Sequence, residues 1–199
     1  MKRIFTAVVA VVLSLAATAN TNGGTTDSKV IVAYVTSWTD IMPDPVFMTH
    51  INYAFGHVNE TFNGVRVDNP ERLKAIVALK KKNPMLKVLL SIGGWGSGRF
   101  SEMAADDSNR KSFARDCQRI VKEFGLDGID IDWEYPTQNS AGISCSADDT
   151  DNFTLLMRDI RSAIGKRKLL TMASVGSAHF VNFTDCIGYL DFVNLMAYD

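Results

Sequence analysis

Short apolar runs alternate with longer amphipathic segments along most of this chain. The apolar runs predict β-strands at residues 30–35, 50–55, 87–92, 128–134, 168–174 and 192–198. Several of them are almost continuously apolar, as in Val88, Leu89 and Leu90, which is typical of parallel strands covered on both sides. The pattern therefore predicts a largely buried parallel sheet.

The amphipathic segments predict helices between the strands. We expect one to begin at Pro70, one after a cap at Ser108, and one at Asp149 or Asp151. Breaks at Asn83-Pro84, Gly125 and Gly165 end them. Strands that alternate with helices predict an α/β fold.

Two α/β architectures fit this alternation, and the residues that follow the first strand distinguish between them. A doubly wound fold would carry a glycine-rich phosphate turn after its first strand, but Thr36, Ser37 and Trp38 stand there instead. Gly93-Gly94 does follow a strand, yet a lone glycine pair usually marks a tight turn. The remaining alternative is a (β/α)8 TIM barrel.

One strand carries a row of acidic residues. Asp130, Asp132 and Glu134 alternate with the apolar residues at 129, 131 and 133, so in a strand the carboxylates share one face. Successive carboxylates are then about 6.5–7 Å apart at the Cα atoms. Burying three unpaired carboxylates would be prohibitively costly, so the row predicts a functional site.

Electrostatics suggests what this row does. Three carboxyl groups this close cannot all ionise freely, so at least one pKa is raised. A carboxylic acid that stays protonated near neutral pH can protonate a glycosidic oxygen as it leaves. Glu134 is last on the strand and reaches furthest, so we expect it to be the general acid, with Asp132 as its partner and Asp130 behind.

The sequence Asp-Gly-Ile-Asp-Ile-Asp-Trp-Glu-Tyr-Pro at residues 127–136 resembles the signature of glycoside hydrolase family 18. This family contains chitinases and endo-β-N-acetylglucosaminidases. Ser-Ile-Gly-Gly-Trp at 91–95 resembles its third-strand motif, and Met-Ala-Tyr-Asp at 196–199 resembles its sixth-strand motif. The resemblance covers residues 30–199 and implies a TIM barrel with its chemistry at the C-terminal ends of the strands.

The resemblance also implies a substrate-assisted retaining mechanism on β-1,4-linked N-acetylglucosamine polymers such as chitin. Glu134 would protonate the leaving oxygen while the sugar's 2-acetamido carbonyl attacks the anomeric carbon. Asp132 would stabilise the resulting oxazolinium, and Tyr198 would hydrogen-bond the acetamido carbonyl. Asp130 would exchange a hydrogen bond with Asp132, supported by Ser91, although a strand-end serine often only satisfies the backbone.

Several aromatic residues are candidates for sugar binding. Trp95 follows two glycines on a loop, so we expect it to stack on a pyranose ring. Tyr34 and Phe55 end the first two strands and resemble the family's floor aromatics, with barrel core as the alternative.

Four further positions complete the candidate set. Met196 is two positions before Tyr198 in the predicted strand, so both point to the same face. Met196 would therefore face the barrel lumen, with a packing role as the alternative. Asp199 would bind substrate by family analogy, or could be frayed at the chain terminus. Trp133 points away from the carboxylates and should be core, while Trp38 and Tyr135 have no assigned role. His50, His57 and His179 show no catalytic partner, so we expect them to be structural or exposed.

Charge and composition exclude other classes of partner. The formal net charge of −1 gives no electrostatic case for nucleic acid or an anionic membrane. The chain has no Cys-x-x-Cys motif or histidine cluster, so we expect no metal and no other cofactor. Cys117 lies on an apolar helical face and should be a small buried hydrophobe. Cys145 and Cys186 are expected in loops, where a bridge between them is conceivable but unsupported.

The N-terminus predicts export. Lys2 and Arg3 precede an apolar run, and Ala17-Thr18-Ala19 forms a cleavage site, so residues 1–19 are expected to be a signal peptide and 20–29 a linker. Residues 30–199 would be a partial catalytic domain, because a closed barrel has eight strands and about 250 residues. We therefore expect the N-terminal portion of a longer secreted protein, poorly soluble or inactive alone. Chitinase is the leading function, with an endo-β-N-acetylglucosaminidase, a chitin-binding lectin and a non-catalytic fragment as alternatives.

Overall fold

The computed structural model describes residues 11–13 and 29–198. Its strands belong to one sheet, in the order β1-β2-β3-β5-β6-β7-β8, with β4 paired to β3. Their bounds are β1 (Val11–Leu13), β2 (Ile31–Thr36), β3 (His50–Val58), β4 (Val65–Val67), β5 (Lys87–Gly93), β6 (Gly128–Asp132), β7 (Leu169–Val175) and β8 (Phe192–Met196). The strands expected from the apolar runs are β2, β3, β5, β6, β7 and β8, and all neighbouring pairs among them are parallel.

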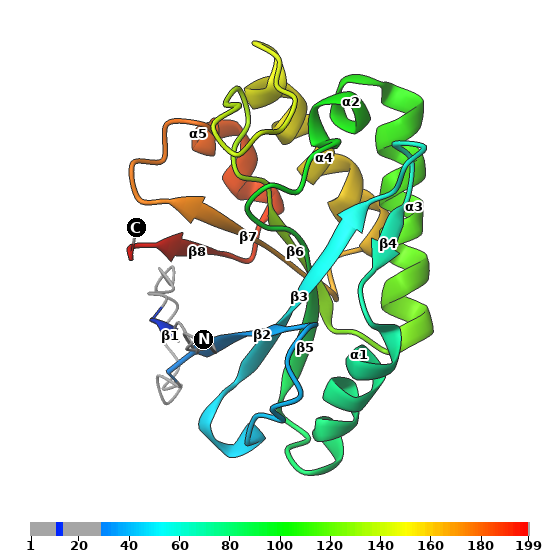
Figure 1. Ribbon diagram of the computed structural model, residues 1–199, viewed down its shortest axis with the longest axis vertical. Coiled ribbons are helices and arrows are strands. Elements are labelled where there is room, and N and C mark those ends of the chain that lie inside the picture. The colour runs from blue at the N-terminus through cyan, green and yellow to red at the C-terminus, as the bar shows by residue number, and fades with distance from the viewer. Residues whose placement is uncertain (1–10, 14–28, 199) are drawn as a thin grey trace, which may run out of the picture.

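The helices cover one side of this curved sheet (Figure 1). They are α1 (Pro70–Val77), α2 (Phe100–Ala105), α3 (Asp107–Phe124), α4 (Asp149–Ile164) and α5 (Phe183–Cys186), with short 3₁₀ turns at Pro45–Phe47, Ala78–Lys81 and Ile187–Tyr189. Six parallel strands with helices on the outside form an open, incomplete (β/α)8 barrel, which confirms the predicted fold class.

Local sequence explains where the long helices begin. The Asn69 side chain accepts the Arg72 N–H ahead of α1, with Pro70 in the first turn as predicted. The cap expected at Ser108 for α3 was wrong. Asp106 has extended backbone angles and its carboxylate accepts the Asn109 N–H at 2.8 Å, so the helix begins earlier.

Several short elements escaped the sequence pattern, among them β4, α2 and α5. β4 pairs antiparallel with the end of β3, and α2 spans only 6 residues. None of the three is long enough to show a hydrophobic period. The loop between β3 and β4 is closed by Asn59, whose side-chain oxygen accepts the N–H groups of Asn63 and Gly64 at 3.0 and 3.2 Å.

The core between sheet and helices contains the apolar face of β6. Ile129 and Ile131 are fully buried, and Trp133 is 3% exposed, as predicted. The Trp133 ring stacks on Phe100 with centroids 5.3 Å apart and tilts against Phe153 at 6.2 Å. This packing fixes the opposite face of the strand, which carries the acidic residues.

β6 is shorter than expected. Its pairing with β7 ends at Ile131 and its pairing with β5 ends at Asp132, so Trp133 and Glu134 lie beyond the strand. The apolar–acidic alternation continues past the strand's end because Trp133 still packs into the core. The pattern alone could not reveal where the hydrogen-bonding partners stop.

The predicted signal peptide and linker lie mostly outside the described residues. Of the first 28 residues, the structure describes Val11–Leu13, which pair antiparallel with β2. The signal peptide stays a prediction. Among the described residues, no helix combines the length and apolar character needed to cross a bilayer.

All three cysteines are free. Cys117 is buried on α3, as expected, and its burial raises the pKa of its thiol well above the usual value. Cys186 is buried at the end of α5 and not in a loop, while Cys145 is exposed. The conceivable bridge between them is therefore absent.

Candidate active site

The acidic row lies at the C-terminal end of β6, near the middle of the parallel sheet. Asp130, Asp132 and Glu134 are buried, with 0%, 5% and 8% of their surface exposed. Strands β5 and β7 flank β6, so Asp130 is paired on both sides and Asp132 on the β5 side. Burial of three neighbouring carboxyl groups is costly unless some are hydrogen-bonded or protonated.

Asp130 is the fully hydrogen-bonded member of the row. Its Oδ2 accepts from the Tyr34 hydroxyl at 2.9 Å and the Ser91 hydroxyl at 2.8 Å. Its Oδ1 accepts from the Thr171 hydroxyl at 2.5 Å and the Asn194 amide at 3.3 Å. The four donors come from β2, β5, β7 and β8, so this carboxylate joins strands that are far apart in sequence.

Thr171 and Asn194 were missed by sequence reasoning. Both point at Asp130 from mostly apolar strands, β8 with Asn194 as its one polar residue and β7 with Thr171 and Ser174 as its two. A polar residue inside an apolar run was the available signal. Asn194 also donates to the Tyr34 hydroxyl at 3.2 Å, which links the two outer donors to each other.

The environments of the first two carboxyl groups differ. Burial raises the pKa of Asp130, and the hydrogen bonds from Thr171, Ser91, Tyr34 and Asn194 oppose that rise. The pKa of Asp132 is raised well above its usual range, by burial first and then by the charges of Glu134 and Asp130. The shared proton expected in the row is therefore favoured more strongly on Asp132 than on Asp130.

One carboxylate oxygen of Asp132, Oδ1, is buried without a hydrogen-bond partner among the described residues. None of the hydrogen bonds of these residues joins Asp132 to Asp130. The exchange expected between these two groups is thus not present in this arrangement. A buried unpaired carboxyl oxygen costs about 1–3 kcal/mol, which is typical of groups kept for a ligand or a reaction.

The Gly93-Gly94 pair lets β5 approach the acidic strand. A Cβ on Gly93 would lie 2.0 Å from the Asp132 carbonyl oxygen, and Gly94 donates its N–H to that oxygen at 2.8 Å. A Cβ on Gly94 would meet the Phe55 ring at 2.8 Å. The glycines therefore serve close packing of backbone and ring, and not phosphate binding.

Several exposed and half-buried aromatic rings, from the later part of β3 and from loops that follow the parallel strands, contact one another. Trp95 is 63% exposed, and its ring meets Tyr135 edge-on at 6.3 Å. Tyr135 stacks on Phe180 with centroids 4.9 Å apart, and Phe55 lies 6.3 Å from the exposed Trp38. Phe180 was missed, because a single phenylalanine in a loop carries no pattern.

Of the remaining candidates, Tyr34 lies on β2 and the others lie on or after β8. Met196 ends the strand and is 9% exposed, while Tyr198 follows it and is 59% exposed. Asp199 lies outside the described residues. Tyr34 is partly buried, and burial together with Asp130 and Asp132 raises the pKa of its hydroxyl, so it remains a donor.

His57 has partners that the sequence did not reveal. Its Nδ1 lies 2.8 Å from Ser97 Oγ, and its Nε2 lies 3.0 Å from Asp68 Oδ2. Ser97 and Asp68 are 40 and 11 positions away from His57, so no local sequence motif indicated these contacts. Among the described residues, no cluster of His, Cys, Asp and Glu could hold a metal ion.

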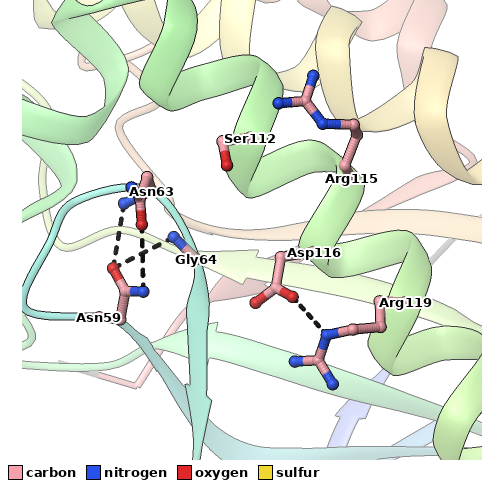
Figure 2. A pocket seen from close by; sticks show the side chains of 7 residues that line it. All are labelled: Asn59, Asn63, Gly64, Ser112, Arg115, Asp116 and Arg119. Carbon is pink, nitrogen blue, oxygen red and sulfur yellow. Dashed lines mark hydrogen bonds and ion pairs between the residues drawn. The ribbon is translucent and has the colours of Figure 1, made fainter.

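A surface hollow of about 360 Å³ lies away from the acidic row, between the loop after β3 and helix α3 (Figure 2). Four of its polar side chains, those of Asn59, Asn63, Asp116 and Arg119, bond to one another, to the backbone or to both. Asp116 pairs with Arg119 at 2.6 Å and accepts the Val65 N–H at 2.7 Å, while Asn59 closes its own loop. These contacts fasten β4 to α3, so we assign the hollow a structural role.

Comparison with known proteins gives one consistent result. The family model for glycosyl hydrolases family 18 matches residues 30–199. The chain is 30% identical to Probable chitinase 2 of Drosophila melanogaster, over 94% of this chain and 43% of that protein. It is 31% identical to Chitinase A1 of Niallia circulans, over 87% of this chain and 34% of that protein. The chain thus spans less than half the length of these relatives.

Solved structures of family 18 and chitinase proteins are similar to this chain as well. The chitinase domain of the spore coat protein CotE from Clostridium difficile has a TM-score of 0.82 at 35% identity, covering 86% of this chain and 50% of that one. A family 18 N-acetylglucosaminidase from Paenibacillus barengoltzii has a TM-score of 0.77 at 39% identity, covering 84% and 53%. Motifs, fold and comparisons coincide over the same residues, and the chain belongs to glycosyl hydrolase family 18.

Proposed function

We propose that this protein hydrolyses β-1,4-linked N-acetylglucosamine polymers, with chitin as the substrate class. The observation that carries the proposal is the buried row of Asp130, Asp132 and Glu134, in which one carboxyl is held by four donors and its neighbour has a raised pKa. Relatives named as chitinases favour chitin over N-glycans.

Glu134 is the proposed general acid. It follows β6 at the C-terminal end of the strand, where TIM-barrel enzymes place their catalytic groups. It would give its proton to the glycosidic oxygen as the bond to the anomeric carbon breaks. The electrons that replace that bond come from the substrate's own acetamido carbonyl, so the row needs no second nucleophilic carboxylate.

Asp132 is the proposed partner of the acetamido group. Its raised pKa favours the protonated form at rest, and transfer of that proton to Asp130, the next carboxyl in the row, would leave a negative charge beside the developing oxazolinium. Asp130, held in place by hydrogen bonds from Tyr34 and Ser91, would be the acceptor of that proton. Tyr198 would hydrogen-bond the acetamido carbonyl.

The aromatic residues would bind the sugar chain. Flat rings stack on the apolar faces of pyranose units, and Trp95 offers such a ring at the rim of the site. Phe55 and Tyr34 would form part of the floor, with Met196 and Asp199 toward the other wall. We infer from the predicted signal peptide that the protein works outside the cytoplasm.

The direct test is hydrolysis of N-acetylglucosamine oligomers by the full chain, with products followed by mass spectrometry. Glu134→Gln keeps the shape of the side chain but has no acidic proton, so we expect turnover to fall at least about a hundredfold while oligomer binding persists. Retention of more than about a hundredth of the rate would refute the assignment. A high-mannose glycopeptide cleaved in preference to chitin oligomers would instead favour the endo-β-N-acetylglucosaminidase alternative.

A further inference from the structure

Three side chains form a hydrogen-bonded series beside the turn that carries Trp95. The Ser97 hydroxyl is 2.8 Å from His57 Nδ1, and His57 Nε2 is 3.0 Å from the Asp68 carboxylate. A neutral imidazole satisfies both contacts if Ser97 donates to Nδ1 and Nε2–H donates to Asp68. A protonated imidazole satisfies them too, by donating from each nitrogen, so the series persists in either protonation state.

The Asp68 end of this series is held by the sheet and by a core residue. Asp68 follows β4, and its N–H donates to the Phe55 carbonyl at 3.1 Å. Its own carbonyl accepts from the hydroxyl of Tyr53 at 2.9 Å, and Tyr53 is fully buried in the core. His57 lies on β3, which is paired on both sides. The Asp68 end therefore belongs to the rigid sheet.

The other end belongs to a turn with little packing of its own. Ser97 donates its N–H to the Gly94 carbonyl at 2.9 Å, and Trp95 is held between Gly94 and Gly96, which have φ of 93° and 81°. Glycine backbones have many accessible conformations, so this turn is costly to order. The Gly94 N–H fixes its start on Asp132, and the Ser97 hydroxyl ties its far side to β3.

We propose that Ser97, His57 and Asp68 are positioning residues that hold the Trp95 indole in place against Tyr135 and so set the affinity for sugar units bound at the rim of the site. The choice of a sugar as the ligand rests on the proposed function. The positioning of Trp95 rests on the geometry alone. If the Trp95 turn is already ordered, it loses less conformational entropy when a sugar binds, so binding is less costly.

The same three residue types make up the serine–histidine–aspartate triad of acyl-transfer enzymes, but their arrangement here differs. In a triad, the nucleophile's own backbone N–H helps to bind the oxyanion, and its hydroxyl meets Nε2. Here the Ser97 N–H is already donated to Gly94, and the hydroxyl meets Nδ1. The geometry therefore supports positioning and not nucleophilic catalysis.

The expected effect is modest, because solvent reaches the series. His57 and Ser97 border a surface hollow of about 290 Å³ together with Trp95, Arg66 and Arg99. Water can replace part of a lost hydrogen bond there, so removing the Ser97 hydroxyl should weaken binding only about two- to tenfold.

The positioning can be tested without any sugar. The chain has 3 tryptophans, so the full chain labelled with 5-fluorotryptophan should give three fluorine resonances, with that of Trp95 assigned by its loss in Trp95→Phe. In Ser97→Ala and in His57→Phe, which keeps a ring at position 57, we expect the Trp95 resonance to sharpen and move toward that of free fluorotryptophan. The Trp133 resonance should stay in place, and Ser97→Thr, which keeps the hydroxyl, should restore the Trp95 resonance.

A calorimetric titration then tests the consequence for binding. Ser97→Ala should weaken binding of the N-acetylglucosamine hexasaccharide about two- to tenfold, leave the disaccharide within twofold, and have no further effect in a Trp95→Ala background. An unchanged Trp95 resonance in both variants, or an undiminished Ser97→Ala effect without Trp95, would overturn the proposal. If wild type binds neither sugar while the resonance moves as expected, the positioning stands and the proposed function fails.

Discussion

The Tyr34 hydroxyl donates a 2.9 Å hydrogen bond to the Asp130 carboxylate, which lies 96 positions away in the chain. This contact joins the first parallel strand to the middle of the sheet. It also stabilises the ionised form of a fully buried carboxyl. The acidic row is therefore held as much by residues from other strands as by its own.

Replacing Tyr34 by Phe should destabilise the fold by about 1.5–3 kcal/mol near neutral pH, because a hydrogen bond to a charged group is lost. The pKa of Asp130 should rise further, since this hydrogen bond lowers it. The destabilisation should therefore shrink at acidic pH, where Asp130 becomes protonated in both proteins. Urea unfolding at several pH values measures this.

Tyr53→Phe provides the matched control. The Tyr53 hydroxyl donates to two backbone carbonyls, those of Asp68 and Asn69, and to no carboxylate. Its loss should carry a cost that does not change between mildly acidic and neutral pH. If both variants showed the same pH dependence, Tyr34 would not be acting through the charge of Asp130.

Replacing Asp132 by Asn should make the protein more stable relative to wild type as pH rises. The folded-state pKa of Asp132 is raised, so its burial is tolerated below the ordinary aspartate pKa and becomes increasingly unfavourable as pH climbs toward the folded value. Asn cannot ionise and escapes this cost, about 1.4 kcal/mol for each unit of pKa rise. Melting temperatures from about pH 4 to pH 8 measure the effect.

In this comparison only the trend with pH is diagnostic, since Asn and Asp differ by a constant hydrogen-bonding contribution. If the difference in melting temperature stayed flat over this range, Asp132 would not carry the raised pKa. For catalysis, we expect Asp132→Asn to lower the rate strongly and to shift the acidic limb of the pH–rate profile, because the coupled proton is gone.

Trp95→Ala should weaken binding of long N-acetylglucosamine oligomers more than short ones, because one stacking platform is removed. The expected loss for the hexasaccharide is about tenfold, comparable to other aromatic stacking contacts. Titration with the disaccharide and the hexasaccharide gives the comparison. Met85→Ala removes another exposed apolar side chain, near the opposite end of β5, and should change neither affinity. Equal losses on both sugars would rule out a subsite role for Trp95.

Asp106→Ala should cost about 1 kcal/mol of stability, because it removes the carboxylate that accepts the Asn109 N–H at the start of α3. Ser108→Ala should change stability by less than about 0.5 kcal/mol, since Ser108 is exposed and lies inside the helix. Chemical unfolding of both variants distinguishes the observed cap from the one expected from sequence. A larger cost at Ser108 would place the cap there after all.

The sequence by itself determined the six parallel strands and the three longer helices between them, the fold class and the acidic face of β6. These properties depend on local periodicity: apolar runs become buried strands, and alternation along a strand separates Ile129, Ile131 and Trp133 from the carboxylates. The family motifs also lie within single segments. Each of these signals is contained in a few consecutive residues.

Only the tertiary structure decided how the acidic residues differ from one another. Asp130 is surrounded by Tyr34, Ser91, Thr171 and Asn194 from four other strands, whereas Asp132 keeps a buried oxygen without a partner among the described residues. The link from Asp68 through His57 to Ser97 likewise spans separate elements. Such contacts depend on which strands become neighbours and where their pairing ends, and hydrophobic periodicity within one segment contains no information about either.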